Sequence, residues 1–214
     1  MGHKTLITNA GFTPKRGWLA GLFITLCLFL HSVPAASQRV EGGVVALKTN
    51  LLYDAVALPS VGVEVYLGAG WTLAADWTYA WWRIDSRNFC HQAYGGYAGV
   101  RKYFGKQSRE RRFSGHHLGL YGSGLTYDFQ HGGKGYQAAR WGFGGGLEYG
   151  YSIPIGKSLN LDLSVGVGYQ DGEYKTYTPQ DGHFVWQGTY IRQWVGPTKA
   201  EVSLVWIIGK KRGK

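Results

Sequence analysis

The chain has 214 residues, 44% hydrophobic and 15% aromatic, and a formal net charge of +10. It has two cysteines, Cys27 and Cys90. Because Cys27 lies in an N-terminal apolar run that we expect to be removed, Cys90 is left without a partner, and we expect no intramolecular disulfide in the fold. The 34 glycines and 33 aromatic residues (nine Trp, fifteen Tyr, nine Phe) favour a closed, strongly curved sheet, because small and large side chains together fit such a surface.

The N-terminus has the order of a secretory signal peptide. Three basic residues, Lys4, Lys15 and Arg16, precede an apolar run of thirteen residues, 18–30. The small-residue stretch 33–37 then offers two cleavage registers, Val33-x-Ala35 and Ala35-x-Ser37. We therefore expect a cleaved signal peptide over 1–37 and one mature domain over 38–214. The alternative, an uncleaved anchor, requires about 18 apolar residues.

Export also limits the partners that the charge can serve. Without the three basic residues of the signal, 20 Lys and Arg remain against 13 Asp and Glu, a balance of +7. An exported chain does not meet nucleic acid, so a lipid surface rich in phosphate or an acidic partner fits the charge better.

Alternation of apolar and polar residues predicts eight strands in the mature chain. It is clearest over 71–81, where Trp71, Leu73, Ala75, Trp77, Tyr79 and Trp81 share one face. The eight segments are 45–53, 61–67, 71–81, 93–105, 116–128, 141–153, 159–169 and 200–208. They predict an all-β fold, an eight-stranded antiparallel up-and-down barrel.

The face that points inward distinguishes two kinds of barrel. A soluble barrel buries its apolar face, whereas a membrane barrel turns that face to lipid. Over 142–152 the face opposite the apolar one reads Gly, Gly, Gly, Glu, Gly, Ser. Glycines weaken a solvent-facing strand but make room inside a narrow barrel. We therefore expect a transmembrane β-barrel of the outer membrane.

Loop lengths agree with this topology, since such barrels have short periplasmic turns and long outer loops. The turns 68–70 and 156–158 are short and lie on one side. The connections 82–92, 129–140 and 170–197 are longer and lie on the other side. The short outer connection 57–60 and the basic inner connection 106–114 depart from the pattern.

Two sets of residues follow from the strand faces. The charged residues on the inner face are expected to form a paired plug in the lumen, with a narrow proton or ion path as the alternative: Lys48, Asp54, Glu64, Asp76, Arg101, Glu148, Asp162, Lys199 and Glu201. Aromatic residues at the strand ends are expected at the level of the lipid headgroups: Trp71, Trp81, Trp141, Tyr151, Tyr169 and Trp206.

No catalytic, cofactor-binding or metal-binding residue is expected. The best catalytic candidates, His117 and Ser123, are six residues apart, about 20 Å along one strand. His116 is no closer to Ser123, and the spacing of Cys, His and carboxylate residues resembles no metal site. The basic segments 101–112 and 210–214 are expected to be solvated, with a dock for phosphates or an acidic partner as the alternative.

The outer ends of the strands are the expected working surface. Residues 170–197 exceed the length of a turn and still look like strands. Exposed aromatic and arginine side chains dominate binding hot spots, and those of this surface are Tyr127, Phe129, Tyr136, Arg140, Trp186, Arg192 and Trp194. The alternative is a set of loops that merely caps the lumen.

Long segments across the mature chain resemble a family of Bacteroidota outer-membrane proteins, the domain of unknown function 3575 family: ALKTNLLYDAVALPSVGVEV (46–65), YAWW (79–82), GHHLGLYGSGLTYDFQHGGKGYQ (115–137), GGGLEYGYSIPIGKSLNLDLSVGVGY (144–169) and GPTKAEVSLVWIIG (196–209). The resemblance implies an outer-membrane location and genes that often lie near those for fimbriae. It brings no catalytic residues.

We therefore expect a non-enzymatic anchor and surface-interaction module in contact with outer-membrane lipid and a fimbrial or other envelope protein. The alternatives are a narrow pore and a lipid-modifying enzyme. The oligomeric state and the ligand stay open.

Overall fold

The computed structural model describes residues 45–84, 89–180 and 183–208, and most of them are in strands. The expected signal peptide over 1–37 and the basic tail 210–214 lie outside the described residues. The elements are β1 (Val45–Asn50), α2 (Leu51–Ala55), β2 (Ser60–Gly68), β3 (Trp71–Ile84), β4 (Phe89–Phe104), α3 (Lys106–Glu110), β5 (Gly115–His131), β6 (Lys134–Ala138), β7 (Gly142–Pro154), β8 (Leu159–Gln180) and β9 (His183–Ile208).

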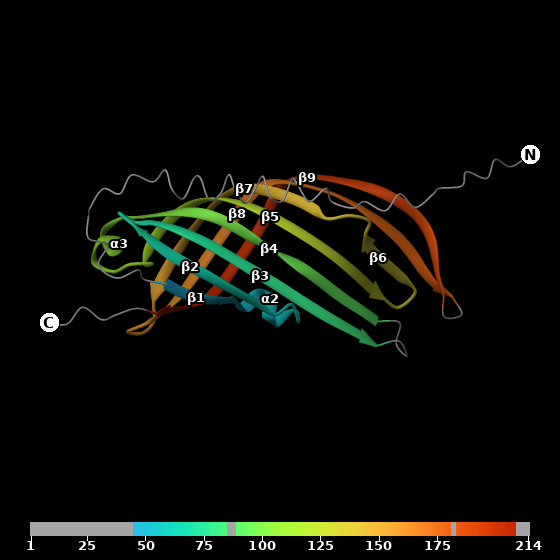
Figure 1. Ribbon diagram of the computed structural model, residues 1–214, viewed down its shortest axis with the longest axis horizontal. Coiled ribbons are helices and arrows are strands. Elements are labelled where there is room, and N and C mark those ends of the chain that lie inside the picture. The colour runs from blue at the N-terminus through green and yellow to red at the C-terminus, as the bar shows by residue number, and fades with distance from the viewer. Residues whose placement is uncertain (1–44, 85–88, 181–182, 209–214) are drawn as a thin grey trace, which may run out of the picture. The chain divides into compact units, whose positions relative to one another are not determined.

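The strands form one antiparallel sheet that closes on itself (Figure 1). Each strand from β1 to β5 pairs with the next, β5 pairs with β7, and β7, β8 and β9 follow in order until β9 meets β1. Eight strands thus make a ring. The ninth strand, β6, pairs with β5 and β8 beyond the start of β7. The eight predicted strands are therefore present, and the segment expected as a connection over 129–140 contains an additional one.

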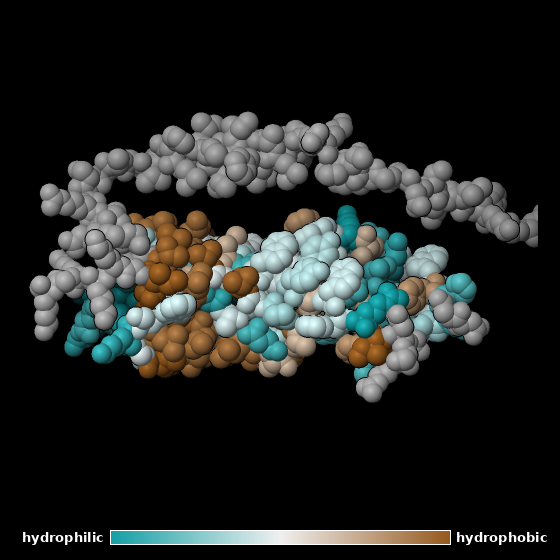
Figure 2. Space-filling model, turned by 60° about the horizontal axis from the view of Figure 1, so that its bottom comes forward, coloured by the Kyte–Doolittle hydropathy of each residue, from teal (hydrophilic) through white to brown (hydrophobic). Residues whose placement is uncertain are grey.

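The predicted alternation is confirmed along the ring. On β3, the side chains of Thr72, Ala74, Thr78 and Ala80 are buried, while those of Trp71, Leu73, Trp77, Tyr79 and Trp81 are exposed. Strand register places exposed apolar residues of five neighbouring strands in one continuous row, which the half-buried Val65 continues on β2: Leu73, Val100, Leu120, Leu147 and Val167. Figure 2 shows the resulting apolar surface on the half of the ring that carries α3.

The first strand is shorter than the alternation predicted. It ends at Asn50, whose side-chain oxygen accepts a hydrogen bond from Leu52 N at 3.1 Å and caps the short helix α2. The predicted strand positions 51–53 are therefore helical. Neither α2 nor any other helix within the described ranges has the length and apolar character of a membrane span.

The two ends of the ring differ. At the end that we call the α3 end, the turns 68–70 and 155–158 are tight, and Gly68, Ala69 and Gly70 all adopt positive φ. At the opposite end, which we call the β8–β9 end, β8 and β9 continue as a long hairpin up to Gln180 and His183. The segment expected as a strand-like connection over 170–197 is thus built entirely of paired strands, apart from residues 181–182, which lie outside the described residues.

Candidate functional site

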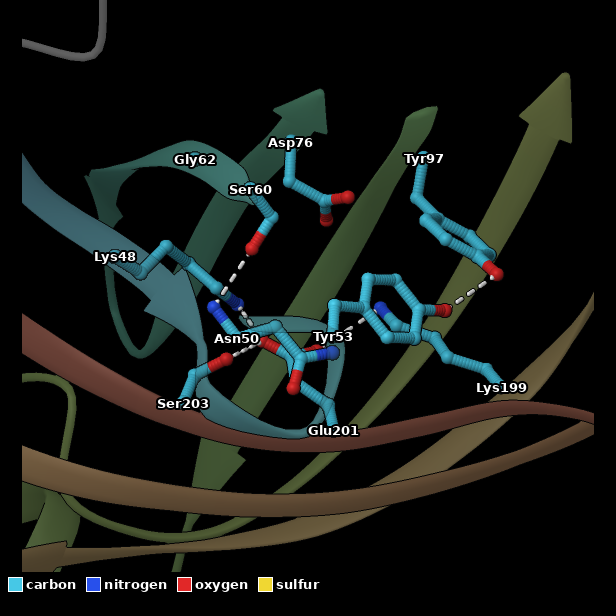
Figure 3. A pocket seen from close by; sticks show the side chains of 10 residues that line it. All are labelled: Lys48, Asn50, Tyr53, Ser60, Gly62, Asp76, Tyr97, Lys199, Glu201 and Ser203. Atoms are coloured by element: carbon cyan, nitrogen blue, oxygen red, sulfur yellow. Dashed lines mark hydrogen bonds and ion pairs between the residues drawn. The ribbon is translucent and has the colours of Figure 1, made fainter. Parts of the chain in front are cut away.

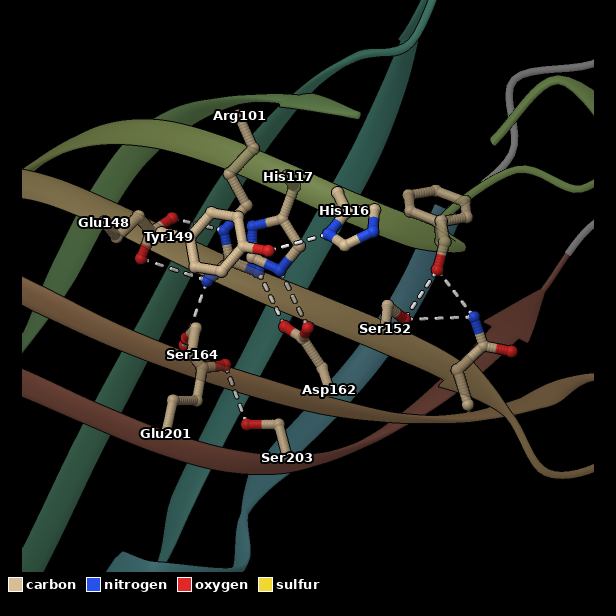
Figure 4. Close-up of polar contacts among 12 residues, drawn as sticks. Arg101, His116, His117, Glu148, Tyr149, Ser152, Asp162, Ser164, Glu201 and Ser203 are labelled. Atoms are coloured by element: carbon tan, nitrogen blue, oxygen red, sulfur yellow. Dashed lines mark hydrogen bonds and ion pairs between the residues drawn. The ribbon is translucent and has the colours of Figure 1, made fainter. Parts of the chain in front are cut away.

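An arginine lies at the centre of the ring interior. Arg101 on β4 is 1% exposed, and its guanidinium contacts carboxylates from four other strands. Figure 4 shows three of them, those of Glu148, Asp162 and Glu201. Arg101 pairs with Glu64 and Asp162 at 3.1 Å, with Glu201 at 2.9 Å, and with Glu148 through its Nε. Because a buried charge is stable only when paired and hydrogen-bonded, Arg101 joins β2, β7, β8 and β9 through the interior.

Two lysines complete this ionic network. Lys199 Nζ lies 2.7 Å from Glu148 and 3.2 Å from Glu201, and Lys48 pairs with Glu201. Hydroxyl groups satisfy further carboxylate oxygens: Thr72 donates to Glu64 at 2.7 Å and Ser203 donates to Glu201 at 2.7 Å. The structure therefore brings together seven of the nine charged residues predicted for the lumen: Lys48, Glu64, Arg101, Glu148, Asp162, Lys199 and Glu201.

Glycines make room for this network. In the interior row of the strand register, Gly119 lies between Arg101 and Glu148, and Gly166 lies between Glu148 and Lys199. A Cβ atom at Gly119 would lie 2.7 Å from Glu148 Oε1, and one at Gly166 would lie 2.8 Å from the Tyr121 ring. The glycine-rich face thus points inward, where the volume of the charged and aromatic side chains requires it.

His117 extends the network toward the α3 end. Its Nε2 lies 2.8 Å from Asp162 Oδ1, and the ring is fully buried against Gly150 and Tyr103. His116, on the opposite face of β5, contacts Tyr149 through its Nδ1 at 2.7 Å. Ser123 pairs in register with Tyr97 and Gly144, six residues along β5 from His117. The three catalytic candidates are therefore separated, and His117 serves the interior.

The α3 end is closed by an aromatic side chain. Phe113 is fully buried in a cluster with Ala46, Tyr103 and Val205, and its carbonyl accepts hydrogen bonds from Ser152 and Asn160 at 2.7 and 2.6 Å. Arg111 fastens the same connection by donating to Gly156 O at 2.7 Å and to Asn160 Oδ1 at 3.0 Å. The basic connection 106–114 is thus attached to the ring, and at least this arginine has a structural partner.

The helix α2 closes the interior from the other side. Tyr53 of α2 contacts Tyr97 of β4 through their hydroxyl groups at 3.0 Å. Beneath it lies a cavity of about 10 Å³ bordered by Lys48, Asp76, Lys199 and Glu201 (Figure 3). Such a volume holds about one water molecule.

Of the two other residues predicted for the lumen, only Asp76 lies at this cavity. Asp76 is half-buried and lines the cavity. Asp54 lies outside the interior because β1 gives way to α2; it is exposed and accepts hydrogen bonds from Thr49 Oγ1 and Ser60 N at 2.7 and 3.2 Å. The expectation of Asp54 in the lumen is therefore wrong.

The six aromatic residues predicted at the strand ends lie at two levels. Trp71, Tyr151 and Trp206 are near the α3 end, at the first residue of β3 and within a few residues of the ends of β7 and β9. Trp81, Trp141 and Tyr169 lie farther along, and Trp141 packs edge-to-face on Tyr94 with ring centroids 5.2 Å apart. Tyr151 is half-buried because its hydroxyl donates to Gln107 of α3 at 2.7 Å.

From the outer of these levels onward the strands form an extension, which we define as residues 79–84, 89–94, 126–138, 172–180 and 183–196. Tyr177 organises it: its hydroxyl donates to Asp128 at 2.6 Å and its ring packs edge-to-face on Phe184. The Arg83 guanidinium lies 5.3 Å from the Phe184 centroid and so joins β3 to β9. Burial, together with the hydrogen bond to the Asp128 carboxylate, raises the pKa of the Tyr177 phenol.

The residues predicted for surface contact lie on or beside this extension. Tyr136, Arg140, Trp186, Arg192 and Trp194 are exposed, and Tyr127 and Phe129 are half-buried and stacked on each other. Arg140 lies 3.5 Å from Glu173, and Trp194 donates to the carbonyl of Pro197 at 3.1 Å. Sequence reasoning missed Tyr190 and Ile191, which lie on the same strand and are equally exposed.

A family model described as "Protein of unknown function (DUF3575)" matches residues 23–208. The chain belongs to the DUF3575 family. No curated protein and no solved structure matches it. For this DUF3575 member, the interior network and the extension are thus the features from which a function must be inferred.

The interior network has few chemical options. Among residues 45–84, 89–180 and 183–208, no three His, Cys, Asp or Glu side chains gather in the way that metal ligands do. Its carboxylates are each occupied by Arg101, a lysine or His117. The network therefore links neighbouring strands through ion pairs, whereas the extension exposes aromatic and arginine side chains to solvent.

Proposed function

We propose that this DUF3575 member is a non-enzymatic outer-membrane β-barrel that anchors a surface-interaction module in the cell envelope. Residues 1–37 would be its cleaved signal peptide and residues 38–214 the mature barrel domain. One observation carries the proposal: the ring places its charges inside and a continuous row of apolar side chains outside.

Lipid explains this distribution and water does not. Leu120, Leu147 and Val167 are 64%, 59% and 57% exposed, so in water each would lose most of the free energy that burial of an apolar side chain provides. The two aromatic levels fit the same solvent. Trp71 and Trp81 lie ten residues apart on β3, which at a strand tilt near 40° corresponds to roughly 25 Å, the height of the apolar band of such barrels.

The extension gives the anchor its role. Strands that continue past the outer aromatic level would project from the membrane and present aromatic and arginine side chains, the types enriched in binding hot spots. We propose a fimbrial or other envelope protein as the partner, in a cell envelope of the Bacteroidota type. The alternative is a purely structural role, in which the extension covers the lumen and binds no partner.

A pore is the weaker candidate because the interior is filled at three levels. Phe113 blocks the α3 end, the network of Arg101 fills the middle, and the cavity beneath Tyr53 measures about 10 Å³. A lipid-modifying enzyme is weaker still, since His117 is fully buried against Asp162 with no serine hydroxyl among its hydrogen-bond partners.

The first experiment tests the membrane barrel. The full chain, expressed in a Gram-negative host, should be recovered in the outer-membrane fraction without residues 1–37 and should migrate faster on a gel unheated than boiled, because a closed ring has no free edge in the bilayer. Recovery in the soluble periplasm, or identical migration in both lanes, would contradict the proposal. In planar bilayers we expect no unitary conductance, and lipid A of a deletion strain should keep its mass.

The second experiment tests the surface role. Residues 178–190 are replaced by a short Gly-Ser link, and fimbrial assembly and surface adhesion are measured beside gel migration. Loss of either phenotype with normal migration supports the proposal. A variant that inserts and keeps both phenotypes at the parental level would leave the extension without this role.

A further inference from the structure

Among the residues that the structure describes, one edge of the extension has no partner strand. On the N-terminal side of Ser203, β9 pairs with β8 alone, because β1 ends at Asn50 opposite Ser203. The Asn50 side chain covers the last part of this edge by donating to Ala200 O at 3.3 Å and accepting from Val202 N at 3.2 Å. Within the ranges that the structure describes, no strand pairs with the remaining edge, residues 184–196.

The matching edge of β3 is covered in part. Past Ser60, where β2 begins, the segment 57–59 takes over: Pro59 O accepts a hydrogen bond from Tyr79 N at 3.2 Å, and Ala57 O accepts one from the Trp82 indole at 2.8 Å. Coverage of this kind is one way in which proteins protect sheet edges from pairing with other chains. No segment within the described ranges covers residues 184–196 of β9 in this way.

The β9 edge also lacks protection by charge. Residues 183–198 contain a single charged residue, Arg192. Side chains along the same stretch are large, apolar and exposed, with Val195 at 79%, Ile191 at 69% and Trp186 at 61%. Pro197, which has no N–H, ends the stretch on the side of the ring. An edge this long and apolar, with a single charged residue, is a template for another strand.

We propose that residues 184–196 of β9 bind an extended segment of a different protein, which adds a tenth strand to the sheet. Unpaired main-chain N–H and C=O groups recognise an extended backbone, and the flanking apolar side chains select for uncharged, proline-free residues at alternate positions. The inference rests on the proposed function, since it gives the chemistry of the partner of the surface module.

Membrane geometry argues against a second copy as the occupant. Two copies in one membrane are related by rotation about the membrane normal, which leaves the outward direction of β9 unchanged. Antiparallel pairing of two β9 edges would require opposite directions. A flexible segment of another protein has no such restriction.

The probe is a fluorescent ten-residue peptide of alternating Thr and Val with one terminal Lys, added to the full chain in detergent micelles. Its twin is N-methylated at every second residue, which removes the hydrogen bonds of one edge and keeps the side chains. Fluorescence polarisation should show that the twin binds at least about tenfold more weakly. Amide exchange of residues 184–196 should slow only with the unmodified peptide.

Variants locate the binding. The double variant Ile191→Lys/Val195→Lys puts charges on the edge and should weaken binding by at least about tenfold. Tyr136→Lys, an exposed aromatic of β6 away from the edge, is the control and should bind as the parent does. Gel migration of all variants should match the parent.

The opposing outcomes are distinct. Equal binding of both peptides, or no binding by a protein that migrates as a folded barrel, would overturn the inference and leave the proposed function standing. A dimer in mass photometry that Ile191→Lys dissociates would assign the edge to a second copy and overturn the choice of occupant. A protein that fails to insert would contradict the proposed function instead.

Discussion

Arg101 and Glu148 lie two strands apart, yet they pair directly because the residue between them in the strand register is Gly119. The glycine leaves the space through which the guanidinium reaches the carboxylate. The same spacing recurs at Gly166, between Glu148 and Lys199. Around the interior, glycines therefore alternate with charged residues on successive strands, and each glycine leaves space for the charged side chains beside it.

Gly119→Ala should destabilise the folded protein. Its Cβ would lie 2.7 Å from Glu148 Oε1 and 2.9 Å from Val100 O, so the backbone or the network must shift. We expect a loss of about 1–3 kcal/mol in the free energy of unfolding, measured by urea titration in lipid vesicles. Gly122→Ala on the same strand is the control, since its Cβ meets nothing closer than 3.9 Å. Equal stability of the two variants would contradict the role of Gly119.

Arg101→Met removes the centre of the network. Glu64, Glu148, Asp162 and Glu201 would each lose a buried partner, and an uncompensated buried charge is costly. The expected loss is about 3–5 kcal/mol in the free energy of unfolding, followed by tryptophan fluorescence in urea. Arg109→Met, at an exposed site in α3, should leave the transition unchanged. A small effect at Arg101 would mean that water already hydrates these carboxylates.

Val165→Arg tests which solvent faces the ring. Val165 is 63% exposed and pairs with Tyr149 and Ala200 on the neighbouring strands. If lipid surrounds it, arginine there should cost about 2–4 kcal/mol of folding free energy in vesicles. Ile191→Arg changes an equally exposed residue in the extension, where water is expected, and should cost little. Similar, negligible costs at both sites would place Val165 in water.

Tyr177→Phe should loosen the extension without affecting the ring. The change removes the hydrogen bond that Tyr177 donates to Asp128 at 2.6 Å, while the packing on Phe184 is kept. A hydrogen bond to a charged group contributes about 1.5–3 kcal/mol. Amide exchange should therefore accelerate in β6 and in β8 past Gly172, and stay unchanged at Arg101 and Glu148. Uniform acceleration over the whole sheet would show that the extension is not an independent unit.

Much of the ring could be predicted from alternation alone. A ring strand with one face in a packed interior must alternate, and the residues that alternate on β3, β7 and β8 are those that the structure separates by face. The inward placement of the glycines followed from volume, and Gly119, Gly150 and Gly166 each fill that role.

The alternation of apolar and polar residues could not predict the helix cap at Asn50 or the register of the strands. Leu51 and Tyr53 continue the alternation of β1, but the Asn50 side chain turns the chain into α2 and removes Asp54 from the interior. An Asn before a possible helix was the available signal. β6 follows a turn at Gly132, whose φ is +60°, and a Gly-Gly pair is likewise a readable turn signal. The four carboxylates around Arg101 required the register of five strands, which one sequence does not contain.

The ring is closed by β1 and β9 alone, and Val202 N donates to Asn50 Oδ1 across 152 positions of the chain. During synthesis, β1 therefore gains its second neighbour, β9, only after the last strand has been made. Until then β1 has only four residues paired, all with β2. A chain that stops short of residue 200 would lack every partner of this seam, so interrupted synthesis leaves β1 without its second neighbour and the sheet unclosed at this seam.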